Sequence, residues 1–185
     1  MNTITPLAAE QAPITAQPYF ADGDPGPIVA ALAHVPELLE AALPCIAASL
    51  GPSAIDLRTK EIVVVRTSAR LSCRYCTDTH TVVARDAGMT TDEVRALRGE
   101  LPATVAFDDE AELALLDWID AVAACGGRPP ETVAAAMTAH WREHEIVELT
   151  WTVGATMLLN RFASSLGLPV SEDTRHRLDA DGFAA

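Results

Sequence analysis

The side chains best suited to chemistry lie in one short stretch, LSCRYCTDTH, at residues 71–80. Cys73 and Cys76 are two of the four cysteines, and His80 follows the second of them by four positions. On a helix of about 3.6 residues per turn, these three side chains share one face. Two thiols at i and i+3 at a helix start can form a disulfide, and the unpaired N–H groups there lower the pKa of a cysteine. The spacing therefore suits a reactive thiolate with a base beside it.

A carboxylate is positioned to orient that base. If a helix over 57–70 turns at residues 71–72 and runs antiparallel to a helix over 73–87, Glu61 and His80 both lie roughly 12 to 15 Å from the turn. They are then level with each other, and Cys76 lies nearer the turn. The geometry predicts the order Glu61, His80, Cys76, which is that of an orienting acid, a base and a nucleophile.

Three interpretations of the cysteine pair stay open at this point. It could be a redox pair, a zinc site that includes His80 and Glu61, or two structural thiols. Structural zinc sites favour several sulfur ligands, and the sequence has no second C-x-x-C, so the redox pair is favoured. The other cysteines, Cys45 and Cys125, are isolated in apolar surroundings, and we expect them to be buried small hydrophobes.

Length, composition and charge limit the classes of function. The 185 residues predict a single domain with a substantial core, and 49% of them are hydrophobic. A net charge of −13 disfavours binding to nucleic acid or to an anionic membrane. The start of the chain shows no signal peptide and no apolar run is long enough to span a bilayer, so we expect a soluble cytoplasmic protein. In that compartment a close cysteine pair is more often catalytic or metal-binding than structural.

The pattern along the chain predicts helices, and no stretch shows clean strand alternation. We expect an all-α fold with three parts, namely an extended N-terminal arm over 1–26, a helical domain over 27–168 and a loosely held tail over 169–185. Asp56, Ser72 and Thr90 or Thr91 are expected helix N-caps, and Pro44 should kink a helix or mark its first turn.

The segment 143–166 is apolar almost throughout. A helix that is apolar on nearly every face is buried on nearly every face. In a chain this short, a subunit interface is one way to achieve such burial. We therefore expect a homo-oligomer of three subunits, or of a multiple arranged as dimers or trimers.

The pattern Glu61-x11-Cys73-x2-Cys76-x3-His80 resembles the motif of the alkylhydroperoxidase D-like (AhpD-like) branch of the carboxymuconolactone decarboxylase family. The closing LLNRFASSLG, residues 158–167, is also similar to the end of that domain, and the similarity spans about residues 35–167. The resemblance implies an all-helical, cofactor-free domain built from antiparallel helical hairpins that assembles into homo-oligomers.

The resemblance also implies thiol peroxidase chemistry. Cys76 would attack a small-molecule peroxide, Cys73 would resolve the product as a disulfide, and Glu61 and His80 would relay protons. A dithiol of the dihydrolipoamide type, or a thioredoxin-like protein, would supply the electrons. Some relatives have a histidine just before the second cysteine, whereas this chain has Tyr75, which cannot act as a base near neutral pH.

Two other classes of function remain open. The dithiol could act as a switch in a non-catalytic module that senses redox state or binds a small ligand. The chain could also be a repurposed family enzyme that acts on another small carbonyl compound. Peroxide turnover with a dithiol reductant separates these alternatives from a peroxidase.

Overall fold

The computed structural model describes residues 3–124 and 126–183, and within these ranges it contains only helices and their connections. The predicted all-α fold is confirmed. The α-helices are α1 (Pro27–Leu32), α2 (Pro36–Leu50), α3 (Leu57–Arg70), α4 (Arg74–Asp86), α5 (Thr91–Arg98), α6 (Ala103–Ala106), α7 (Glu110–Ala123), α8 (Glu131–His140), α9 (Glu143–Leu166) and α10 (Glu172–Ala180). In the part of the chain that is described, no helix combines the length and apolarity needed to cross a membrane.

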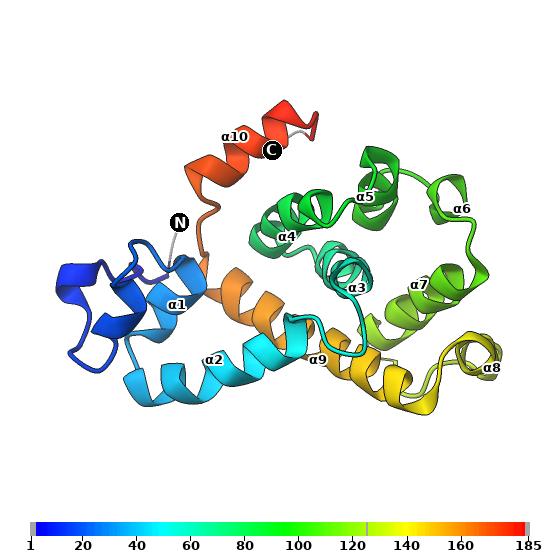
Figure 1. Cartoon of the computed structure of the whole chain (residues 1–185), viewed down its shortest axis with the longest axis horizontal. Helices are drawn as coiled ribbons and strands as arrows, with labels where there is room; N and C mark the ends of the chain where they lie inside the picture. Colours follow the sequence, from blue (N-terminus) through cyan, green and yellow to red (C-terminus); the bar gives the residue numbers. More distant parts are fainter. Residues whose placement is uncertain (1–2, 125, 184–185) are drawn as a thin grey trace.

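Helix α3 lies at the centre of the molecule and packs against α4, α5, α7 and α9 (Figure 1). It forms an antiparallel hairpin with α4. Residues 60–65 of α3 are all buried, which explains how the β-branched run IVVV remains helical, since packing on several sides outweighs weak helix propensity. The hairpin places Glu61, Cys73 and Cys76 in the interior of the fold.

Local capping signals set several helix boundaries as predicted. Asp56 accepts a 2.8 Å hydrogen bond from the Thr59 N–H and starts α3. Thr90 and Glu93 form a reciprocal capping box at the start of α5. Helix α9 spans the predicted 143–166. These boundaries depend on side chains within one turn of the helix end, so the sequence contains the information that fixes them.

Ser72 was expected to cap α4, and this prediction is wrong. It has a φ of +55° and belongs to the end of α3, where its N–H donates to the Ala69 carbonyl and the Cys73 N–H donates to the Ser68 carbonyl. This is the Schellman pattern, which needs a left-handed residue at the position of Ser72. Cys73 is consequently the N-cap of α4, and α4 begins at Arg74.

Helix α2 continues through Pro44, which lies in its third turn and therefore does not mark a helix start. The segment expected as an extended arm contains two 3₁₀ helices, Ala9–Gln11 and Gln17–Phe20. It is attached to the rest of the chain, because Phe20 is buried against the residues of α1 and α2 and the Thr3 N–H donates to the Leu166 carbonyl.

The prediction of a loosely held C-terminal tail is wrong for the described residues. Ser171 caps α10, and Leu178 and Phe183 are buried in the main core. Arg177 pairs with Asp86 of α4 at 2.5 Å. Apart from Leu178 and Phe183, the C-terminal segment is very polar. Its hydrophobic pattern is therefore too weak to predict that α10 packs against the main core.

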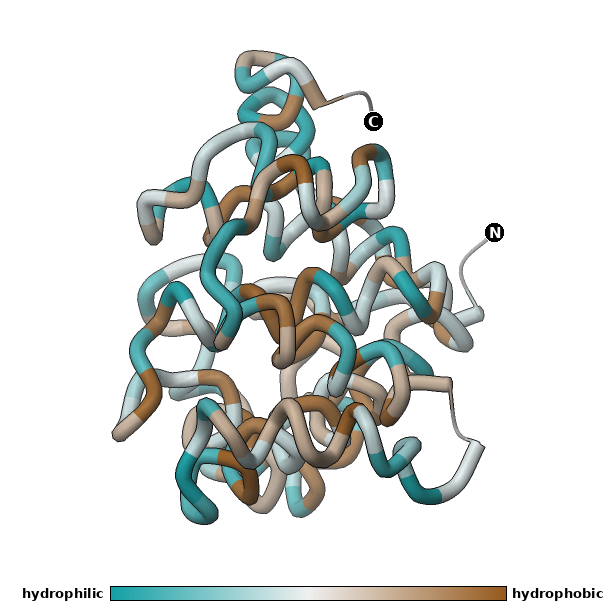
Figure 2. Tube along the Cα trace, turned by 90° about the vertical axis from the view of Figure 1, so that its right-hand side faces the viewer, coloured by the Kyte–Doolittle hydropathy of each residue, from teal (hydrophilic) through white to brown (hydrophobic). Residues whose placement is uncertain are grey.

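Hydrophobic residues gather in the middle of the molecule (Figure 2). The main core combines residues of α3, α5, α7, α9 and α10, and a second cluster joins the N-terminal segment to α1 and α2. A third, smaller cluster contains Cys73 and Cys76 together with Ala31, Ala163 and Leu168. The cysteine pair therefore lies where α1, the start of α4 and the end of α9 meet.

A buried cation joins three helices. Lys60 of α3 is fully buried, and its Nζ donates to the Ser49 carbonyl at 2.9 Å and to the Thr152 hydroxyl at 3.1 Å. Its charge is balanced by Glu148 of α9, whose Oε1 lies 2.7 Å from Nζ. A buried charge is tolerated only when it is paired and hydrogen-bonded. These contacts fix the end of α2 and the first half of α9 to the helix that carries Glu61.

Candidate active site

The α3–α4 hairpin brings Glu61 and His80 into direct contact. Glu61 is buried, and its two carboxylate oxygens lie 2.9 and 3.2 Å from Nδ1 of His80. The Glu61 carboxylate accepts a hydrogen bond from the Nδ1–H of His80, so Nε2 of the neutral ring is the free basic nitrogen. The predicted alignment of these two side chains across the hairpin is confirmed by this geometry, while their catalytic roles stay a prediction.

Cys73 and Cys76 also meet, at the first turn of α4. Their sulfur atoms are 2.8 Å apart and both residues are buried, with 1% and 5% of their surface exposed. Cys73 is the N-cap and Cys76 lies three residues later, so both thiols are at the positive end of the helix. The pair is close enough to share a proton and to form a disulfide with little movement.

Hydrogen bonding between the two sulfurs lowers the pKa of Cys73 to about 6, although burial of the thiol works in the opposite direction. Ser164 of α9 and the charge of His80 also contribute to this lowering. The same sulfur–sulfur hydrogen bond, burial and the neighbouring negative charge raise the pKa of Cys76 above its ordinary value. The pair thus loses one proton near neutral pH and keeps the second.

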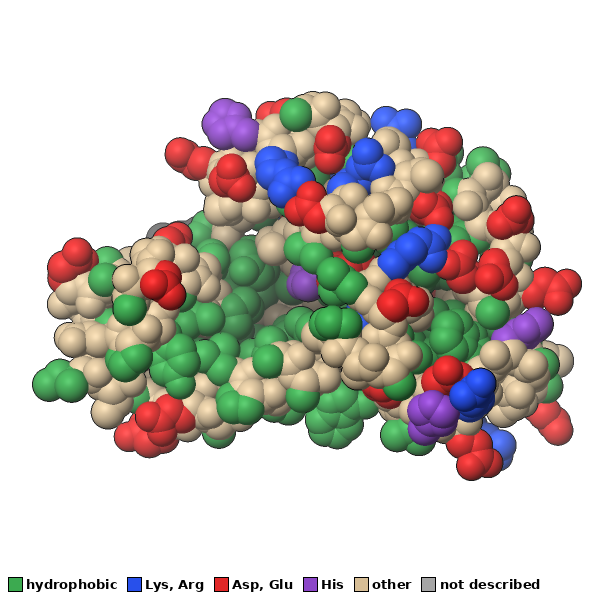
Figure 3. Space-filling view, in the orientation of Figure 1, with side chains coloured by type: hydrophobic (Ala, Val, Ile, Leu, Met, Phe, Trp, Pro, Cys, Tyr) green, Lys and Arg blue, Asp and Glu red, His purple; other side chains and the backbone are tan. Residues whose placement is uncertain are grey.

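The surroundings of the sulfurs are largely apolar. Ile28, Phe162 and Leu166 pack against the cluster that contains the pair. Figure 3 shows a hollow, lined mainly by hydrophobic side chains, between the N-terminal helices and the α3–α4 hairpin. Tyr75 is half-buried beside the pair, and burial together with the two sulfurs raises its pKa to about 12. Tyr75 therefore remains a neutral phenol and lines the site without acting as a base.

Asn160 of α9 was not identified from the sequence. It is buried, and its side-chain N–H donates to the Ser68 hydroxyl at 3.0 Å. It also lies close enough to Cys76 to lower the pKa of that thiol in part. Its Oδ1 is buried and has no hydrogen-bond partner among the described residues. An asparagine inside an otherwise apolar helix was the available signal, because a buried amide normally has a bonding role.

One expected contact is not present. Within residues 3–124 and 126–183, no hydrogen bond joins His80 to either sulfur, and the histidine acts on Cys73 through its charge. The described residues also contain no group of three or more His, Cys, Asp and Glu side chains arranged to hold a metal ion.

The structure tests the expected burial of the isolated cysteines at Cys45 alone. Cys45 was predicted to be buried, but it is exposed on α2. Helix α2 packs along only part of its circumference, which the apolar sequence ALPCIAASL could not reveal. Cys125, also predicted to be buried, lies outside the described residues.

Comparison with known proteins identifies relatives of this arrangement. The family model described as "Carboxymuconolactone decarboxylase family" matches residues 36–121, which contain Glu61, both cysteines of the pair and His80. A search of curated protein sequences finds no match.

Solved structures share the whole fold. An AhpD-core, peroxidase-related protein from Ralstonia eutropha has a TM-score of 0.81 at 18% identity and covers 94% of both chains. A protein of unknown function from Agrobacterium tumefaciens, described as a candidate antioxidant defence protein AhpD, is 28% identical, with a TM-score of 0.63 over 76% of this chain and 97% of its own. The debrominase Bmp8 in complex with 2,3,4-tribromopyrrole has a TM-score of 0.78 at 20% identity over 96% of both chains.

Proposed function

We propose, from the match of residues 36–121 to the carboxymuconolactone decarboxylase family model, that the chain is a thiol-dependent peroxidase of the alkylhydroperoxidase type. The observation that carries this proposal is the arrangement of two sulfurs 2.8 Å apart on the hairpin that also holds the Glu61–His80 pair. A buried thiol pair with one lowered pKa, next to an oriented histidine, has the parts that two-electron reduction of a peroxide needs.

The reaction has two steps within the protein. His80 takes the proton of a cysteine thiol, and the resulting thiolate attacks the distal oxygen of ROOH. The O–O bond breaks, the thiolate becomes a sulfenic acid, and RO⁻ takes the proton from His80 and leaves as ROH. The second thiol then attacks the sulfenic sulfur, releasing water and forming the Cys73–Cys76 disulfide. An external dithiol, such as dihydrolipoamide or a thioredoxin-like protein, reduces the disulfide by thiol–disulfide exchange.

We assign the attack to Cys76 and the resolving step to Cys73. The resting negative charge is favoured on Cys73, but a proton shared across 2.8 Å can move between the sulfurs as a peroxide arrives. Cys76 is the more exposed of the two, and it lies one helical turn from His80, whereas Cys73 lies two turns away. A reducing compartment such as the cytoplasm would return the pair to the dithiol form between turnovers.

The test is peroxide consumption with dihydrolipoamide or dithiothreitol, on the wild type and on Cys76→Ser, Cys73→Ser and Cys45→Ser. We expect turnover in the wild type and in Cys45→Ser, the matched control for an exposed cysteine outside the pair. Cys73→Ser should react once and stop as a sulfenic acid, and Cys76→Ser should not react. Trapping with dimedone followed by mass spectrometry locates the sulfenic acid.

Two results would change these conclusions. Dimedone on Cys73 in the Cys76→Ser protein, with none on Cys76 in the Cys73→Ser protein, would reverse the two roles. Absence of peroxide turnover in the wild type, with the pair shown to be reduced, would remove the peroxidase proposal altogether.

A second candidate is reductive chemistry on another small substrate, favoured by the similarity of the whole chain to a debrominase. Here the dithiol would supply the two electrons that replace a carbon–bromine bond by carbon–hydrogen, releasing bromide and leaving the disulfide. The same protein samples assayed with 2,3,4-tribromopyrrole, with bromide release as the readout, distinguish this activity from peroxide reduction.

A further inference from the structure

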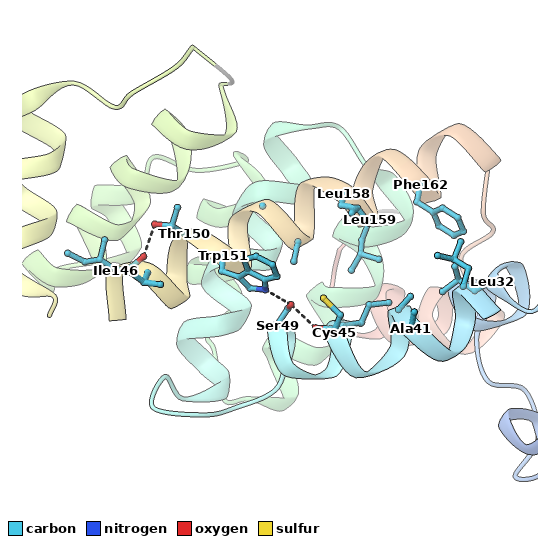
Figure 4. A pocket seen from close by; sticks show the side chains of 16 residues that line it. Leu32, Ala41, Cys45, Ser49, Ile146, Thr150, Trp151, Leu158, Leu159 and Phe162 are labelled. Atoms are coloured by element: carbon cyan, nitrogen blue, oxygen red, sulfur yellow. Dashed lines mark hydrogen bonds between the residues drawn. The ribbon is translucent and has the colours of Figure 1, made fainter. Parts of the chain in front are cut away.

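Helix α9 brings two polar side chains to the cysteine pair. Asn160 and Ser164 lie four residues apart and therefore share one face of the helix, and Ala163 between them packs in the cluster that contains both sulfurs. Another face of α9 lines an apolar groove of about 870 Å³ beside α2, and its lining includes Leu158 and Phe162 but neither of the two polar residues (Figure 4). The two polar side chains thus belong to the face of α9 that meets the cysteines.

A residue of α3 holds the buried Asn160 amide in place. The Nδ2 of Asn160 donates to the Ser68 hydroxyl at 3.0 Å. The main-chain carbonyl of the same serine accepts the N–H of Cys73 at 3.0 Å, at the start of α4. Ser68 therefore ties the amide to the turn that presents both thiols. An amide nitrogen carries two hydrogens, so a second N–H of Asn160 is available for a sulfur.

The oxygen of the same amide makes no hydrogen bond. Oδ1 of Asn160 is buried and has no partner among the described residues. A buried carbonyl oxygen without a partner destabilises a folded protein, so the benefit of this amide lies at its nitrogen. The sulfur it affects is that of Cys76. The hydrogen bond with Cys73 and burial raise the pKa of Cys76, and a hydrogen bond from Asn160 opposes them.

Ser164 affects the other sulfur. The hydrogen bond with Cys76 is the main cause that lowers the pKa of Cys73 to about 6, and a hydrogen bond from the Ser164 side chain adds to that lowering. Each sulfur thus has its own donor on α9, and the two donors lie one helical turn apart.

We infer that these two side chains of α9 assign the roles of the two cysteines. Asn160 donates to the Cys76 sulfur and stabilises negative charge there when Cys76 attacks. Ser164 donates to the Cys73 sulfur and stabilises the charge there at rest and in the resolving step. The inference rests on the proposed function, because it divides the steps of that reaction between the two thiols.

The charge moves between the two donors during one turnover. When His80 takes the proton of Cys76, negative charge develops on a sulfur at which the Asn160 N–H is already directed, and such a preorganised donor favours the charged state. After the attack, Cys76 is a neutral sulfenic acid and the thiolate of Cys73 expels its hydroxyl group, which takes a proton and leaves as water. When the thiolate of an external dithiol then attacks Cys76, Cys73 leaves as a thiolate, and a thiol of low pKa is the better leaving group.

Titration of each thiol by itself tests the inference without any substrate. In protein labelled with ¹³C at the cysteine Cβ atoms, the Cβ signal shifts as the thiol loses its proton, so NMR measures the pKa of Cys76 in Cys73→Ser and of Cys73 in Cys76→Ser. Asn160→Leu keeps a side chain of similar size but removes the donor, and it should raise the pKa of Cys76 by about one pH unit. It should change the pKa of Cys73 by less than half as much. Ser164→Ala should do the reverse.

Thr156→Val is the matched control. Thr156 is buried on the same helix, one turn before Asn160, and its hydroxyl donates to the Thr152 carbonyl of its own helix at 2.8 Å. Its loss should leave the pKa of both cysteines unchanged. If Asn160→Leu does not fold, Ser68→Ala replaces it, because removal of the hydroxyl that orients the amide should raise the pKa of Cys76 by a smaller amount in the same direction.

The sign of the change decides the outcome. A pKa of Cys76 that falls in Asn160→Leu would mean that the amide oxygen accepts from the thiol, which overturns the inference. Equal changes at Cys76 and Cys73, no change at either, or a change of the same size in Thr156→Val would also overturn it, since each would show that α9 does not distinguish the two sulfurs.

Peroxide reduction provides a second readout. With both cysteines present, Asn160→Leu should slow single-turnover oxidation of the pair about threefold to tenfold. A pKa higher by one pH unit leaves about ten times less thiolate, and the greater nucleophilicity of a more basic thiolate offsets part of that loss. Thr156→Val should react at the wild-type rate, and an equal rate in Asn160→Leu would contradict the role in attack. A wild type that consumes no peroxide would remove the peroxidase proposal, while the titrations would still decide whether α9 divides the charge between the two sulfurs.

Discussion

The protonation of the Cys73–Cys76 pair sets the pH range in which the site is reactive. The pKa of Cys73 is lowered to about 6 from an ordinary value of 9.0, first by the hydrogen bond with Cys76. A lowered thiol pKa means that the thiolate is present above pH 6 and is lost as the pH falls through that value. We therefore expect one thiolate per chain at pH 7, where an ordinary thiol would be almost fully protonated.

Absorbance near 240 nm measures this thiolate without requiring a reagent to reach the buried sulfurs. The difference between the wild type and Cys73→Ser should rise with a midpoint of about pH 6. Tyr75 does not interfere below pH 9, because its pKa is raised to about 12. A midpoint close to the ordinary value would show that the two sulfurs do not share a proton in solution.

Glu61 and His80 should act as one unit. Glu61→Gln keeps the shape of the side chain but removes the charge that orients the Nδ1–H of His80, and His80→Gln removes the base. Each should slow single-turnover peroxide reduction by a similar factor, of about 10²–10⁴. The double variant should be no slower than the slower single variant, since the two changes remove the same function. Multiplied effects would show that the two residues act separately.

The sequence predicted that Glu61 would meet His80 and that Cys73 would lie beside Cys76. It did not predict that Asn160 of α9 lies beside the cysteines. Glu61 and His80 meet because helical spacing and one tight turn fix their relative height, and both are properties of a short stretch of chain. Asn160 reaches the cysteines from a helix more than eighty residues further along the sequence. Its position depends on how α9 packs against the hairpin, and no local pattern encodes that packing.

The turn between α3 and α4 is the element on which the site depends. Ser72 holds a left-handed conformation at φ +55°, which costs a residue with a side chain about 1–2 kcal/mol relative to glycine. Ser72→Gly removes that strain but makes the unfolded chain more flexible, which costs about 0.5–1 kcal/mol. We expect the free energy of unfolding to rise by about 0–1.5 kcal/mol, measured by urea denaturation.

The matched comparison is Ser72→Ala, which keeps a Cβ and therefore the strain, and it should be no more stable than the wild type. A clear loss of stability in Ser72→Gly would show that the serine side chain contributes more than its backbone conformation costs.

Helix α10 should contribute to stability through its apolar anchors. Leu178 is 1% exposed within the main core, so Leu178→Ala should lower the free energy of unfolding by about 2–5 kcal/mol. Val105→Ala removes a similar apolar group from an exposed position and should change stability by less than about 0.5 kcal/mol. Chemical denaturation of both variants tests this, and equal effects would mean that α10 detaches before the rest of the protein unfolds.

For the molecule as a whole, pH acts on stability through two opposing effects. The pKa of Glu148 is lowered by Lys60 and Ser53, and that of Asp120 is lowered because hydrogen bonds from Arg70 and Arg66 outweigh the effect of burial. Stabilisation from a lowered carboxyl pKa is fully present above the ordinary values, 4.5 and 3.8, and is lost as the pH falls through the lower folded values. Against this, lowering the pH from 7 towards the pI of about 4.6 reduces the repulsion that accompanies −13 charges.

We therefore expect the urea midpoint to be highest between about pH 5 and 6 and to fall below about pH 4. Glu148→Gln should flatten the acidic side of this curve and lower the midpoint at pH 7, since it leaves Lys60 without its counter-charge. Stability that increases steadily down to pH 3 would show that repulsion outweighs the ion pairs.

The buried amine of Lys60 can report how often α2 and α9 separate from α3. Lys60 is the one lysine of the sequence, and its amine is enclosed by contacts with Ser49, Thr152 and Glu148. A succinimidyl ester therefore acylates a lysine only in molecules where α2 and α9 have separated from α3. The yield of acylated Lys60 peptide with time, read by mass spectrometry, measures how often this junction opens under native conditions. No introduced label or substitution is needed for that measurement.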